Sequence, residues 1–123
     1  MNETLQQLEA WGCNIQGALP RFLDDEAFML ECIVQVSEDP AFETLGDFLA
    51  KNKVKQAFDS AHTLKGILAN TGLTPLYETI VQIVEPLRTG SAQGLMPQYT
   101  KLLNTRRDLI DLLNRSPEEN CPA

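Results

Sequence analysis

The residues best suited to chemistry lie in the segment Phe58 to Gly72, FDSAHTLKGILANTG, which holds the only histidine of the 123 residues. In a helix, His62 shares its face with Lys65, Gly66 and Ala69, at positions i+3, i+4 and i+7. Helical side chains lean toward the N-terminus, so the residue at i+4 lies over the residue at i, and a glycine there leaves the imidazole uncovered. The pattern predicts an accessible imidazole beside a cation.

An accessible imidazole outside a pocket can act as a nucleophile toward a phosphoryl group that another protein delivers. Lys65, one helical turn along, would neutralise charge on the phosphoryl oxygens. A Ser-His-Asp or Cys-His hydrolase is disfavoured, because no cysteine is a helical neighbour of His62. No GxGxxG or GxxxxGKS/T loop occurs, so nucleotide binding has no support. The simpler interpretation is an exposed helix residue without a role.

The helix that carries His62 is amphipathic. Lys55 and Asp59 lie on the same outward or flanking face as His62, with Phe58 at its border. The opposite side of the helical wheel is the apolar stripe expected to face a core, formed by Val54, Ala57, Ala61, Leu64, Leu68 and Thr71.

The apolar periodicity of the whole chain is helical throughout. It predicts helices over about 3–11, 24–38, 40–51 and 53–71, and a last helix from 92 or 96 to 114, with a further turn at 14–19. Between these, a fifth helix is expected to start at 74 or 75 and to have Leu76, Ile80, Ile83 and Leu87 inward. The stripe of the second long helix is expected to comprise Phe28, Met29, Cys32, Ile33 and Val36.

Glycines, prolines and acidic residues punctuate this pattern. Asp24 or Asp25 is an expected N-cap, and Pro40 an expected first helical residue. Thr74 is predicted to cap a helix that Pro75 opens, and Pro86 to kink that helix or end it early. Gly12 and Gly72 are expected to stop the helices before them.

These elements predict an all-α fold, an antiparallel up-down four-helix bundle with a short additional N-terminal helix or helices. The chain is long enough for one domain without disulfides or metal. We expect an N-terminal cap over about 1–22, a bundle over about 24–115 and a frayed tail at 116–123.

The net charge of −7 argues against nucleic acid or anionic membrane as the main partner. Four of the ten basic residues nevertheless lie near His62, either as a local basic patch or as a solvated helix start: Lys51, Lys53, Lys55 and Lys65. Cys13, Cys32 and Cys121 form no CxxC pair, so no metal site is expected. Without a leader-like or 18-residue apolar stretch, the sequence predicts a cytoplasmic protein with reduced thiols.

The string HTLKGILANTGL, with AHxLKG and a glycine ten residues after the histidine, resembles the signature of histidine-containing phosphotransfer domains of phosphorelays. The resemblance extends to the preceding ALPRFLDDEAFMLECIVQV and the following LTPLYETIVQIVEPLRTG, and covers about residues 15–114. It implies a phosphohistidine carrier without autonomous kinase activity. In it His62 accepts the phosphoryl group, Lys65 assists the phosphate, and Gly66 gives the partner room.

One position departs from the family. Many members have Glu or Gln twenty-two residues after the histidine, where the side chain holds the other ring nitrogen, and this chain has Val84. The orienting group is expected to be shifted to the adjacent Glu85 or the nearby Gln82, to be supplied by backbone or water, or to be absent.

The resemblance implies response-regulator receiver domains as partners, with Mg²⁺ held by the receiver, and a hybrid sensor histidine kinase upstream. A monomer that binds no cofactor itself is expected. The alternative is an interaction module that binds a receiver or a partner helix and is never phosphorylated. In either case the docking surface is expected to comprise Phe58, Lys55, Ala69, Leu73 and Val84.

Overall fold

The computed structural model describes residues 2–115, and every regular element in this range is helical. The all-α prediction is therefore confirmed for the described chain. The predicted tail and Cys121 lie outside it. The elements are α1 (Glu3–Trp11), α2 (Ile15–Ala18), the 3-10 helix η1 (Leu19–Phe22), α3 (Glu26–Ser37), α4 (Ala41–Ala50), α5 (Val54–Asn70), α6 (Thr74–Arg88) and α7 (Met96–Asn114).

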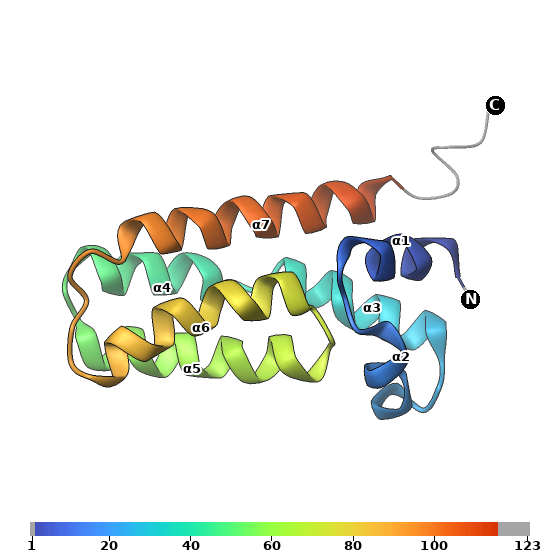
Figure 1. The fold of residues 1–123 in the computed structure, drawn as a ribbon, viewed down its shortest axis with the longest axis horizontal. Helices are drawn as coiled ribbons and strands as arrows, with labels where there is room; N and C mark the ends of the chain where they lie inside the picture. Colours follow the sequence, from blue (N-terminus) through green and yellow to red (C-terminus); the bar gives the residue numbers. More distant parts are fainter. Residues whose placement is uncertain (1, 116–123) are drawn as a thin grey trace.

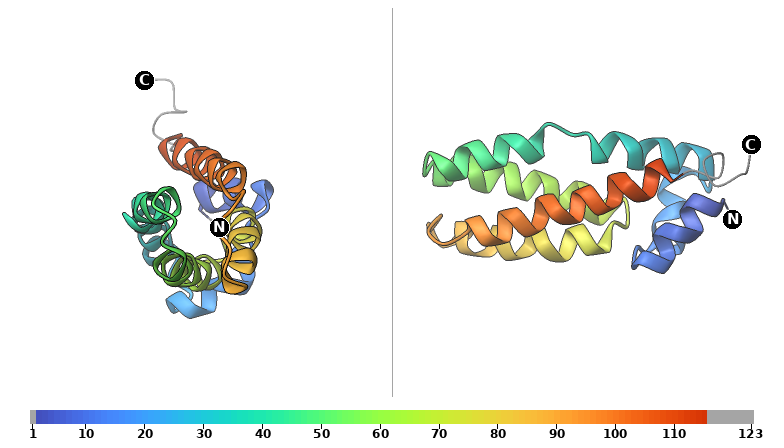
Figure 2. Two further views of the ribbon diagram at one scale, coloured as in Figure 1. Left: turned by 90° about the vertical axis from the view of Figure 1, so that its left-hand side faces the viewer. Right: turned by 90° about the horizontal axis from the view of Figure 1, so that it is seen from above.

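Helices α4 to α7 lie lengthwise beside one another, and each runs opposite to the one before it (Figures 1 and 2). Beyond a short break at residues 38–40, α3 continues the line of α4, so that the two form one interrupted rod. Helix α5, which carries His62, packs between α4 and α6. No helix within residues 2–115 has the length and apolar character needed to cross a membrane.

The local sequence accounts for the helix ends. The side chain of Asn2 accepts hydrogen bonds from the N–H groups of Thr4 and Leu5, at 2.7 and 3.2 Å, and so caps α1. Gly12 ends this helix at φ +121°, a conformation that suits glycine. Asp25 caps α3 by accepting from the N–H of Phe28 at 3.0 Å. The predicted caps at Asp25 and Gly12 are confirmed.

Two predicted helix starts were wrong by one residue. Leu73 is the N-cap of α6 and makes no side-chain cap bond, while Thr74 is already helical. The hydroxyl of Thr74 turns back to the Gly72 carbonyl, at 3.5 Å, so it does not cap the amides ahead. Pro40 is the N-cap of α4. The N–H of Ala41, the first residue of the helix, donates to the side chain of Asp39 at 2.8 Å.

Helix α6 continues past Pro86 and ends at Arg88, two residues later than the earliest end that was expected. Proline has no N–H to donate to the carbonyl of Gln82, so the helix lacks one hydrogen bond there, and it continues for only two residues beyond Pro86. The N–H groups of Thr89 and Gly90 donate to the carbonyls of Pro86 and Leu87, at 3.1 and 3.0 Å, and these hydrogen bonds end the helix.

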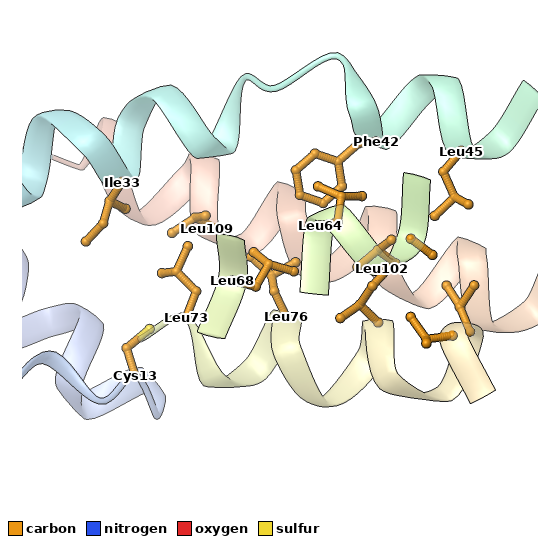
Figure 3. Close-up of a cluster of buried hydrophobic side chains, with 14 of the residues drawn as sticks. Cys13, Ile33, Phe42, Leu45, Leu64, Leu68, Leu73, Leu76, Leu102 and Leu109 are labelled. Carbon is orange, nitrogen blue, oxygen red and sulfur yellow. The ribbon is translucent and has the colours of Figure 1, made fainter. Parts of the chain in front are cut away.

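Buried apolar side chains from all the long helices meet between them (Figure 3). The predicted stripe of α5 is confirmed at its centre, because Ala57, Ala61, Leu64 and Leu68 are fully buried. In contrast, Phe28 of α3 is 43% exposed, although it was expected in the inward stripe. It lies at the edge of the core, where its ring meets Phe22 edge-on at 5.8 Å.

The N-terminal helices dock where α5 meets α6 (Figure 1). The N–H of Asn14 donates to the carbonyl of Gly72 at 2.8 Å. Gly72 has φ +71°, and a Cβ on it would lie 2.5 Å from the Asn14 oxygen, so this contact needs glycine for two reasons. Beside it, Cys13 and Leu73 point into the core (Figure 3). Burial raises the pKa of the Cys13 thiol to about 12.

One arginine of α7 spans the break between α3 and α4. Arg106 donates from Nε to the carbonyl of Ser37 at 2.7 Å and from Nη1 to Glu43 at 3.1 Å. Its guanidinium lies over the ring of Phe42, 4.7 Å from the centroid. This side chain therefore holds the last residue of α3 and the first turn of α4 together.

Candidate functional site

The amphipathic character of α5 decides where His62 lies. The residue immediately before the histidine is the fully buried Ala61, and the imidazole itself is exposed. Since α4 and α6 cover the flanks of α5, the histidine lies on the outward strip between them. The predicted outward orientation of His62 is thus confirmed.

The imidazole has one described neighbour. It stacks on Phe58, one turn earlier on α5, with ring centroids 5.6 Å apart and planes inclined at 25°. Within residues 2–115 no side chain or backbone group forms a hydrogen bond or an ion pair with the ring. Both nitrogens are therefore free of protein partners in this part of the chain.

Gly66 leaves the space beside the histidine open. A Cβ built on this glycine would meet no atom within 4 Å apart from its own helix. Close packing of another helix therefore does not explain the glycine. Gly46 in α4 shows the opposite situation, because a Cβ there would overlap the phenol ring of Tyr99.

The predicted cation stands on the same face. Lys65 is half-buried, and no carboxylate of the described chain lies within ion-pair distance of its amine. Lys55 and Ala69 are exposed, one on each side of the histidine along α5. An exposed imidazole, an uncommitted ammonium group and an open glycine are thus brought together on one helix face.

Two residues of the expected docking surface do not belong to it. Leu73 and Val84 are both fully buried. Leu73 points into the core at the junction of α5 and α6 (Figure 3), and the side chain of Val84 is enclosed where α6 packs against its neighbours. The exposed or half-buried part of the predicted surface is therefore confined to α5: Lys55, Phe58 and Ala69.

Neither candidate for the orienting group reaches the imidazole. Gln82 is exposed and lines a cleft of about 300 Å³ with Trp11 of α1 and Lys101 of α7, on the α7 side of α6. Glu85 is exposed and pairs with Arg88 at 3.3 Å. Val84, at the family position, is apolar and buried. Within the described chain, the histidine ring is left without a hydrogen-bonding side chain.

Arg88 was not anticipated as a site residue. Its guanidinium lies over the ring of Phe58, 5.4 Å from the centroid, and also forms the ion pair with Glu85. This contact joins the end of α6 to the face of α5 that carries His62. The i+3 spacing of Glu85 and Arg88 was visible in the sequence, but the contact across helices depends on the register between α5 and α6.

A cleft of about 270 Å³ opens farther along the same side of α5, near Ala69. Arg21 of η1 lines this cleft, and its guanidinium donates to the carbonyl of Asn70 at 3.1 Å. No spacing in the sequence indicated that Arg21 and the other N-terminal residues of the cleft lie beside α5. The cleft is lined by Asn14, Arg21, Leu68, Ala69, Gly72, Thr74 and Tyr77.

Comparison of the chain with protein-family models, with curated proteins and with solved structures finds no match.

Proposed function

We propose that this chain is a phosphohistidine carrier of a phosphorelay, in which His62 exchanges a phosphoryl group with receiver domains. The observation that carries the proposal is an exposed imidazole with no hydrogen-bonding partner in the described chain, beside the open space at Gly66. A nucleophile that must meet a phosphoryl group on another protein needs this access. Lys65 is free to meet the incoming charge.

The chemistry needs no pocket in this chain. The unprotonated ring nitrogen of His62 attacks the phosphorus of an aspartyl phosphate on the receiver. The N–P bond forms as the acyl-phosphate O–P bond breaks, and the aspartate leaves as a carboxylate. The reverse reaction on a second receiver returns the imidazole. Mg²⁺ belongs to the receiver in this scheme, and a hybrid sensor histidine kinase supplies the group upstream.

The arrangement of the helices supports the same proposal. We infer one domain in which α3 with α4, and then α5, α6 and α7, form an antiparallel four-helix bundle, with α1, α2 and η1 as its N-terminal cap. Such a bundle can present a histidine at the middle of a helix while the flanking helices provide a docking surface. Cys13 and Cys32 are free thiols, in keeping with a cytoplasmic protein.

The test is transfer from a phosphorylated receiver. The chain is incubated with a panel of receivers labelled on their aspartates, and the products are treated with acid and with base. Acid-labile, base-stable label on the wild type, absent from His62→Gln, is the expected result. A chain that binds receivers but acquires no such label would instead be an interaction module, and the proposal would be wrong.

A further inference from the structure

An exposed histidine that must meet a reactive phosphorus needs its ring held in place. Two side-chain torsions are otherwise free to rotate, and each unproductive orientation lowers the rate of attack. In many proteins a hydrogen bond to the second ring nitrogen does this. Within residues 2–115, His62 has no such bond: Val84 is apolar, Gln82 lines a cleft with residues of α1 and α7, and Glu85 pairs with Arg88.

The contact that remains is with Phe58. This ring is half-buried and packs against the core cluster, so its own position is determined by the interior. The imidazole stacks on it at 5.6 Å and 25°, within the range of offset aromatic pairs. Phe58 therefore offers a surface that opposes rotation of the histidine ring.

Phe58 is itself held from the neighbouring helix. The guanidinium of Arg88 lies over the phenyl ring at 5.4 Å, a cation–π distance, and Glu85 pairs with that guanidinium at 3.3 Å. The four side chains form a row that runs from α6 to the histidine. Glu85 thus lies at the far end of the row from His62, which explains why it does not bind the imidazole directly.

We propose that Phe58, held by Arg88, is the positioning residue of the His62 imidazole, and that aromatic stacking replaces the missing hydrogen bond. This inference rests on the proposed phosphoacceptor function. It assigns to Phe58 a role in the rate of phosphoryl acceptance, in addition to any part in docking. Phe58 touches no reacting atom, so its effect passes through the orientation of the imidazole.

The experiment uses the whole chain and a small phosphoryl donor. Phosphoramidate needs no protein partner: the ring nitrogen attacks its phosphorus, the P–N bond to the amino group breaks, and ammonia leaves. Rates of phosphohistidine formation are measured for the wild type and for Phe58→Leu, Phe58→Tyr and Arg88→Met. Arg107→Met, which removes an exposed charge on α7, is the matched control for the loss of Arg88.

Phe58→Leu should slow phosphorylation by about two- to tenfold, the kinetic equivalent of one aromatic stack. Phe58→Tyr should retain the wild-type rate. The rate for Arg88→Met should lie between those of Phe58→Leu and the wild type, and the rate for Arg107→Met should match the wild type. Melting temperatures are recorded for each variant, and rates are compared well below the lowest of them. Equal rates for Phe58→Leu and the wild type would overturn the inference.

A second measurement separates this inference from the proposed function. Because His62 is the only histidine, its ring protons give isolated NMR signals. In the wild type and in Phe58→Tyr they should carry ring-current shifts that Phe58→Leu loses. If receivers fail to phosphorylate the wild type, the proposed function is wrong, and these shifts still decide whether Phe58 holds the ring. Shifts that are the same in all three proteins would refute the stacking.

Discussion

Gly46 of α4 lies against Tyr99 of α7 so closely that a Cβ on the glycine would overlap the phenol ring, whose hydroxyl donates to the carbonyl of Phe42 at 2.8 Å. Gly66 of α5 has no such neighbour within 4 Å. The absence of a side chain therefore has a different structural effect at each of these two mid-helix positions. The first admits another helix, and the second leaves open the approach to His62.

These two glycines should respond oppositely to alanine. Gly66→Ala should stabilise the protein by up to about 1 kcal/mol, because alanine is the better helix former and the new methyl meets open space. Gly46→Ala should destabilise it by about 1–3 kcal/mol through overpacking against Tyr99. Urea unfolding measures both. A destabilised Gly66→Ala would show that the open space is filled in solution.

Larger side chains at Gly66 should separate access from stability. A residue at i+4 leans back over residue i, so Ser, Gln and Leu at this position should progressively cover the imidazole. The rate of phosphoryl transfer from a receiver should fall in that order while the fold is kept. If the rate is the same for all three, the glycine has no part in access.

Replacing Lys65 should lower the rate of phosphoryl transfer more than replacing a lysine near the start of α5. The amine of Lys65 has no carboxylate partner in the described chain and lies on the face of His62, one turn away. Lys65→Ala should slow receiver transfer about tenfold, as expected for the loss of one charge-assisted contact. Lys53→Ala, which removes an exposed lysine before the first turn, is the control and should change the rate less than about twofold. Equal losses would indicate a general effect of charge.

His62→Gln should leave the protein folded. The imidazole is exposed and its one described contact is the stack on Phe58, so the free energy of unfolding should fall by less than about 1 kcal/mol. Thermal unfolding followed by circular dichroism measures this. A larger loss would mean that the ring is a structural residue.

The thiol of Cys13 should make stability depend on pH in the alkaline range. Its folded-state pKa of about 12 lies above the ordinary value of 9.0, because the side chain is buried. As the pH rises past 9, the unfolded chain loses this proton first. The stabilisation is therefore complete below pH 9 and is lost between pH 9 and 12.

Urea unfolding at pH 8 and pH 10.5 tests this. The wild type should lose about 1–2 kcal/mol more than Cys13→Ala between the two conditions. Cys32→Ala, at a half-buried thiol of α3, should behave as the wild type does. The same loss for all three proteins would mean that water reaches Cys13 in the folded state.

The sequence predicted the helices well because their signals are local. The apolar stripe of α5 and the cap at Asp25 each depend on residues within a few positions, and these predictions were confirmed. Burial across helices was harder to predict. Val84 and Leu73 were expected on the docking surface, because a helical wheel does not include the neighbouring helices that enclose them.

The contact between Arg88 and Phe58 was missed for the same reason. The ion pair of Arg88 with Glu85 lies within one helix, but the position of Arg88 over Phe58 depends on how α6 is aligned with α5. The accessible imidazole, in contrast, follows from the identity of two residues in one helix. The histidine face could therefore be read from the sequence, while its support from α6 required the structure.

The break between α3 and α4 divides the interrupted rod into two halves whose neighbours are partly different. Helix α3 packs on η1 and α7, whereas α4 packs mainly on α5 and to a lesser extent on α7, so α7 is the neighbour that the two halves share. Residues 38–40 connect the two halves along the chain, and α7 joins them by packing on both and through the contacts of Arg106. Because amide hydrogen exchange reports local opening, protection in α3 should depend on its contacts with η1 and α7, and protection in α4 mainly on its contacts with α5.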